Sequence, residues 1–142
     1  MRSFLLFLIV CTLFSCSNQN KKKQTIIDPN DSSEMALMMR DMFFKLNDIK
    51  SKIQSGQDIS YEQLRFSIIH ESEATDNSFL NNSLTLMSKA FEQKVIDFNN
   101  YPSVQNYTEI VNNCISCHQG MCPGPIQRID NLILEKKDNL DC

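Results

Sequence analysis

The sequence predicts an all-α domain built as an antiparallel four-helix bundle, and three observations support this fold class. Apolar residues recur at alternating spacings of three and four, which is typical of amphipathic helices. The 142 residues include only three glycines and four prolines, too few for a turn-rich all-β fold. No segment shows the marked apolar–polar alternation of a half-buried strand. A chain of this length forms one domain with its own core.

The first long helix is predicted to begin at Asp31, which with Glu34 forms a capping-box-like start, and to end at Gly56. Its apolar face consists of Met35, Met39, Met42, Leu46, Ile49 and Ile53. A second, shorter helix is predicted from the capping box at Ser60 to a point near His70. Its apolar residues are Leu64, Ile68 and Ile69.

A third helix is predicted from an apolar face that ends where Asn99, Asn100 and Pro102 follow. That face consists of Leu80, Leu84, Met87, Phe91, Val95 and Phe98. Ser103 is the predicted cap of a fourth helix, which carries Val104, Tyr107, Val111 and Cys114. Gly120 and the Pro-Gly-Pro stretch at 123–125 then end the fourth helix, and one short final helix is predicted over residues 126–133.

Residues 1–15 predict a signal peptide rather than part of the fold. The apolar run after Arg2 is shorter than the roughly 20 residues of a spanning helix. It ends in Leu13-Phe14-Ser15-Cys16, which resembles the lipobox of bacterial lipoproteins, with Cys16 as the lipidated residue. The alternative is a secretory signal cleaved near Ser15 or Ser17, with Cys16 unmodified.

The remaining chain divides into a lipidated Cys and flexible tether at 16–31 and a helical domain at 32–142. A lipid on Cys16 would anchor the protein to a membrane without spanning it. The tether contains Lys21, Lys22 and Lys23, which contact anionic lipid or simply keep the linker solvated. The net charge of −3 excludes an ordinary nucleic-acid binder, which carries a basic surface.

The chemistry is concentrated in Cys114-Ile115-Ser116-Cys117-His118, a C-x-x-C-H motif typical of covalent haem attachment. The two thiols add to the two haem vinyl groups, and His118 follows closely enough to bind the iron from one side. We therefore expect one covalent haem c. The export signal agrees with this expectation, because bacteria attach haem c outside the cytoplasm.

The motif has three other interpretations. A thioredoxin-like redox pair needs a βαβ pattern around the cysteines, and the sequence shows none. Cys114, Cys117, His118 and Cys122 have the side-chain types of a structural zinc site, although zinc sites usually use two separated pairs of ligands. A plain disulfide between Cys114 and Cys117 is the third alternative.

The chain resembles class II cytochromes c, the cytochrome c′ type, in the C-x-x-C-H motif of its last bundle helix and in the segment from Ala36 to Met42. The similarity covers residues 33–120 and implies a four-helix bundle in which a first-helix methionine is the sixth iron ligand. Met39 is the first candidate and Met42 the second, with His70 as a bis-histidine alternative. The resemblance also implies that Arg40 lies near the haem propionates.

The tail after the motif is longer than in most class II chains. Its Cys122-Pro123-Gly124-Pro125 is similar to a sequence in small haem lipoproteins of Gram-negative bacteria. Once the signal peptide is removed and Cys16, Cys114 and Cys117 are modified, Cys122 and Cys142 are the two cysteines left over. Export favours a disulfide between them, and free thiols or an intermolecular link are the alternatives.

Two functions follow as expectations. The first is a membrane-tethered electron carrier, not an enzyme, that exchanges electrons with respiratory-chain proteins on the periplasmic side of an inner or outer membrane. The second is a protein that binds or senses NO or CO at a five-coordinate haem iron. Leu37, Met39 and Phe43 would form an apolar wall on the open side of the iron. A third hypothesis is a structural lipoprotein with a zinc or disulfide knot and no haem. Class II relatives are often homodimers, which leaves a homodimer open here.

Overall fold

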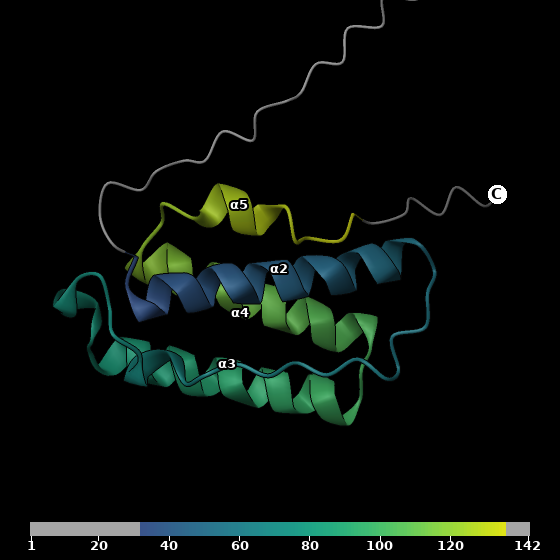
Figure 1. Cartoon of the computed structure of the whole chain (residues 1–142), viewed down its shortest axis with the longest axis horizontal. Coiled ribbons are helices and arrows are strands. Elements are labelled where there is room, and N and C mark those ends of the chain that lie inside the picture. Colours follow the sequence, from purple (N-terminus) through teal and green to yellow (C-terminus); the bar gives the residue numbers. More distant parts are fainter. Residues whose placement is uncertain (1–31, 136–142) are drawn as a thin grey trace, which may run out of the picture.

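The computed structural model describes residues 32–135, which fold into helices and their connections without any strand (Figure 1). The predicted all-helical fold class is confirmed. The elements, labelled as in Figure 1, are α2 (Glu34–Gln54), the 3-10 turns η2 (Ile69–Glu71) and η3 (Asn77–Phe79), α3 (Asn82–Asn100), α4 (Val104–Met121) and α5 (Ile126–Asp130). Within the described residues, no helix is long and apolar enough to cross a membrane.

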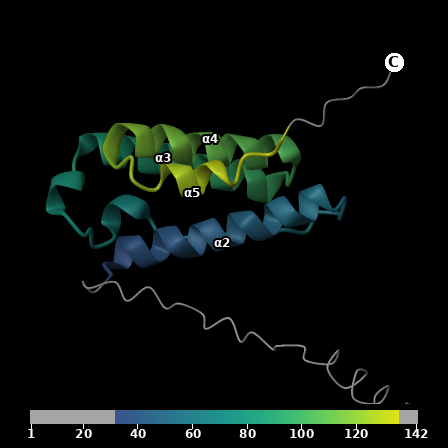
Figure 2. The same ribbon diagram turned by 90° about the horizontal axis from the view of Figure 1, so that it is seen from above.

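The helices form two groups. The backbone of α4 packs closely against α3 and α5. Figure 2 shows α2 facing this group along its length, and α2 runs in the same direction as α3 while α4 runs back. α2 is not among the helices in extensive backbone contact with the others, so long side chains fill the space between the two groups.

The predicted helix from Ser60 to His70 is wrong, because residues 62–68 are extended and only a 3-10 turn follows. Burial in this segment alternates, with Leu64 buried between exposed neighbours, as in an extended chain. Asn99 holds this conformation: its side chain accepts from Leu64 N at 2.7 Å and donates to Leu64 O at 2.8 Å. A helix this short is marginal on its own, so such tertiary bonds decide the conformation.

The extended segment bridges α2 and α3. Lys52 on α2 forms an ion pair with Glu62 at 2.7 Å, and Lys45 donates to the carbonyl of Arg65 at 3.3 Å. On the other side, Gln63 donates to the carbonyl of Asn99 at 2.9 Å. The return of the chain along this route explains why α2 and α3 run in the same direction (Figure 1).

Most helix ends follow local sequence signals. Ser33, not Asp31, is the N-cap of α2 and accepts from Ala36 N at 3.2 Å. Gly56 has a φ of +71°, a left-handed conformation that suits glycine after a helix end, as predicted. Ser103 caps α4 as predicted, accepting from Asn106 N at 3.2 Å. α3 begins after Leu80, with Asn81 as its cap.

The core joins the predicted apolar faces. Phe98, Tyr107 and Ile110 are fully buried, and Leu46 and Leu132 are nearly so. The hydroxyl of Tyr107 donates to the carbonyl of Leu132 at 2.7 Å. Burial raises the pKa of Tyr107 well above its usual value, so this hydroxyl stays a donor at any ordinary pH. The segment after α4 is therefore held against the core rather than projecting from it.

Replacing Tyr107 with Phe leaves the Leu132 carbonyl without its buried donor. We expect Tyr107→Phe to lower the free energy of unfolding by about 1–3 kcal/mol, the usual cost of an unsatisfied buried polar group. Denaturant unfolding measures this change. Tyr101→Phe is the control, because Tyr101 is 73% exposed and a surface change of this kind stays within about 0.5 kcal/mol. Equal effects of the two variants would contradict this role of the hydrogen bond.

Candidate functional site

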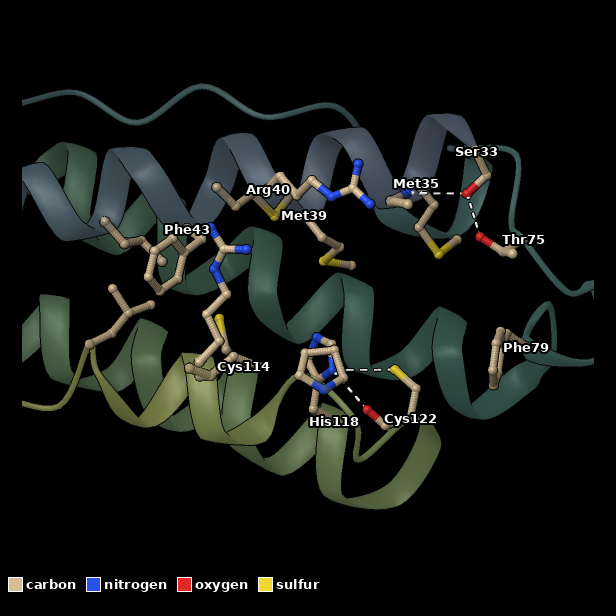
Figure 3. Close-up of a pocket in the computed structure, with 17 residues that line it drawn as sticks. Ser33, Met35, Met39, Arg40, Phe43, Thr75, Phe79, Cys114, His118 and Cys122 are labelled. Atoms are coloured by element: carbon tan, nitrogen blue, oxygen red, sulfur yellow. Dashed lines mark hydrogen bonds between the residues drawn. The ribbon is translucent and has the colours of Figure 1, made fainter. Parts of the chain in front are cut away.

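A cavity of about 350 Å³ lies between α2 on one side and α4, α5 and the following residues on the other (Figure 3). Thr75 and Phe79, from the loop before α3, also line it. The other residues around it are Ser33, Met35, Ala36, Met39, Arg40, Met42, Phe43, Leu46, Cys114, His118, Cys122, Pro125, Arg128, Ile129 and Leu132. Its size and mostly apolar lining, with a few polar groups, are typical of a site for a small organic ligand or cofactor.

His118 lies in the last turn of α4 and is only 8% exposed. Its Nδ1 lies 3.1 Å from the carbonyl oxygen of Cys122 and 3.3 Å from the Cys122 sulfur (Figure 3). A carbonyl only accepts, so Nδ1 carries the proton and donates to it. The lone pair of the neutral ring is then on Nε2, the nitrogen available to bind a metal.

The two cysteines of the motif and the nearby Cys122 are in different surroundings. Cys114 lines the cavity, and Cys122 lines it beside His118. Cys117 is half-buried against the core. Unlike Cys114 and His118, it is not among the residues that line the cavity. Burial, with repulsion from Cys117, raises the pKa of Cys114 to about 12. Burial also raises the pKa values of Cys117 and Cys122, so all three thiols are neutral near pH 7.

Of the three candidates for the sixth iron ligand, two reach the cavity and one does not. Met39 and Met42 of α2 both line it, and Figure 3 shows Met39 across the cavity from His118. Met42 is more deeply buried, at 4% exposed, as part of the core. His70 is not among the lining residues; its Nδ1 lies 2.8 Å from the hydroxyl of Ser88 on α3. The structure therefore does not bring His70 to His118.

The cavity wall differs in part from what the sequence predicts. Arg40 lines the cavity and donates to the Ser32 hydroxyl at 2.7 Å, and its place near haem propionates stays a prediction. Leu37, expected in the wall, is 56% exposed and is not part of the lining. Arg128 was not singled out from the sequence, yet it lines the cavity from α5. Its placement depends on how the tail folds back, which no local motif encodes.

Several sequence predictions fall outside the described residues. These are the signal peptide, lipidation at Cys16, the tether and the partner of Cys122 at Cys142. For the zinc alternative, residues 32–135 contain no group of three or more His, Cys, Asp or Glu side chains arranged to hold a metal ion. The chain matches none of the protein-family models, curated proteins or solved structures with which it was compared.

The raised pKa of Cys114 leads to a prediction about how fast this thiol is alkylated in the reduced, unmodified chain. Alkylation requires the thiolate, and a thiol of pKa about 12 is ionised in roughly one molecule in 10⁴ at pH 8. We expect Cys114 to react more slowly with iodoacetamide than Cys122, with a rate that still rises as the pH approaches 12. Peptide mass spectrometry after timed alkylation measures both rates. Reaction of Cys114 at the rate of an ordinary thiol at pH 8 would contradict the raised pKa of this thiol.

Proposed function

We propose that the protein is a monohaem c-type cytochrome that carries electrons while tethered to a membrane. One observation supports this function above the others. The C-x-x-C-H motif lies within α4 with Cys114 and His118 in the wall of a mostly apolar cavity, and a methionine of α2 lies opposite the histidine (Figure 3). A thioether and an imidazole on facing helices are a common pair of haem iron ligands.

The residues around the cavity fit such a group. His118 would bind the iron through Nε2. The hydrogen bond from its Nδ1 to the Cys122 carbonyl holds the ring and makes Nε2 a stronger electron-pair donor to the iron. Cys114 would form one thioether directly at the cavity wall. Cys117 would form the other, which requires its half-buried side chain to turn towards the cavity from its position one residue before His118.

When bound, haem c supplies an iron that alternates between Fe(II) and Fe(III). The sulfur of Met39 would bind the iron from α2; such a soft ligand favours Fe(II) and raises the reduction potential compared with a second histidine. Met35, Phe43 and Leu46 exclude water from the site, which also disfavours the more highly charged oxidised state. A carrier of this kind needs no nucleophile or proton-transfer residue.

The proposal includes the wider setting predicted from the sequence. Cys16 would carry the lipid that holds the domain at the periplasmic face of a membrane, near respiratory redox partners. The architecture would be a variant of the class II bundle. The extended segment at 62–68 takes the place of its second helix, and α5 covers the cavity from the tail side.

A second candidate function is binding of NO or CO at a five-coordinate iron. The observation that favours it is the chemistry of the wall opposite His118, where Met35, Met39 and Phe43 are all apolar. Flexible methionines often fill such space without binding a metal. An iron left open on this side would accept a small uncharged gas.

The optical spectrum of the exported, matured protein tests the proposal and separates the two functions. We expect a red protein whose haem stays with the polypeptide after acid–acetone extraction, because thioethers hold it. The carrier is expected to be low-spin in both oxidation states, with no spectral change on addition of CO. A high-spin spectrum that changes with CO would favour gas binding, and a colourless protein from a host that attaches haem c would refute both.

The ligand assignment is tested by Met39→Ala. Loss of the thioether is expected to convert the low-spin spectrum to a high-spin one and to make the iron reactive towards CO. Met87→Ala is the matched control, because Met87 lies on α3 and is not part of the cavity lining. A Met39→Ala variant that stays low-spin, with the change appearing in Met42→Ala instead, would move the ligand one helical turn along α2.

A further inference from the structure

Arg128 brings a positive charge to the cavity lining. Among the described residues, the lining includes no Asp or Glu. The acidic residues of the facing helix are occupied elsewhere: Asp41 pairs with Lys45 at 2.7 Å, Asp48 pairs with Lys52 at 2.8 Å, and Glu34 accepts from Glu73 N at 3.2 Å. A positively charged wall of this kind selects a ligand that brings its own negative charge.

Arg128 is positioned by two aromatic rings. Its guanidinium carbon lies 4.5 Å from the centre of the Phe43 ring and 5.5 Å from that of Phe44. Cation–π contacts at these distances hold the guanidinium plane, and its N–H groups donate no hydrogen bond within the part of the chain that the structure describes. Within residues 32–135 it forms no ion pair, not even with Asp130, the one acidic residue of α5.

The tail brings Arg128 to the cavity in a fixed place. Ile129 and Leu132, next to it in sequence, are buried and also line the cavity. The Tyr107 hydroxyl holds Leu132 through its carbonyl. A guanidinium offers several N–H donors in one plane, a geometry that matches the two oxygens of a carboxylate.

We propose that Arg128 is a binding residue for a carboxylate of the ligand in this cavity. This inference rests on the proposed function, in which the ligand is haem c and the carboxylate is one of its propionates. The tail after the C-x-x-C-H motif then contributes a recognition group to the site as well as covering it. Arg128 keeps that propionate ionised, since a neighbouring cation lowers the pKa of a carboxylic acid by about 1–3 units.

The test is the reduction potential of the matured protein, measured as a function of pH in the wild type, Arg128→Gln, Arg128→Lys and Arg65→Gln. Arg65→Gln removes the same charge from the extended segment, outside the cavity lining. In Arg128→Gln, the pH-dependent step assigned to the propionate is expected to move up by about 1–3 units. Arg128→Lys, which keeps the charge, is expected to restore much of the wild-type profile, and Arg65→Gln to leave it unchanged.

The outcomes separate this inference from the function on which it rests. Covalent haem with equal profiles for Arg128→Gln and Arg65→Gln would overturn the role of Arg128 and leave the cytochrome proposal standing. A shift in Arg128→Gln that Arg128→Lys does not reduce at all would indicate a structural effect and also overturn it. A protein that never acquires covalent haem would overturn both.

Discussion

The hydrogen bond from the buried Tyr107 hydroxyl to the Leu132 carbonyl is the constraint on which the site depends. α4 ends at Met121, and the described residues beyond it, up to 135, contain only the five-residue α5, too short to be stable alone. Attachment of Leu132 to Tyr107 in the first turn of α4, together with burial of Ile129, turns this segment into a wall of the cavity. Without that wall, His118 and Cys114 would lie on an open helix face.

The end of α4 combines a structural and a chemical role in one residue. The amide of Cys122 donates to the carbonyl of His118 at 3.1 Å and closes the helix, while the carbonyl of Cys122 accepts from the His118 ring. The bond that terminates the helix therefore lies beside the bond that orients the imidazole. A histidine held this way keeps one tautomer and presents one nitrogen. In the proposed cytochrome, this would suit an iron ligand that stays in place through changes of oxidation state.

The separation of α2 from the other helices creates the cavity. α4 is in close backbone contact with α3 and with α5, whereas α2 approaches through long side chains such as Met39, Met42 and Leu46. The extended segment keeps α2 connected to α3 through Lys52–Glu62 on one side and Asn99–Leu64 on the other. Methionine suits such a boundary, because its flexible thioether fills irregular space and also binds soft metals.

The sequence by itself determined what depends on near neighbours in the chain. The spacing of apolar residues predicted α2, α3 and α4. Gly56 and Ser103 marked the end of α2 and the start of α4, and the five residues from Cys114 to His118 were predicted to lie at the end of that last helix. Only the tertiary structure decided that residues 62–68 are extended, that His70 bonds Ser88 away from the cavity, and that Arg128 lines it. The physical reason is range: Asn99 meets Leu64 across 35 positions, and Tyr107 meets Leu132 across 25. Such contacts override local propensity, and no periodicity or motif records them.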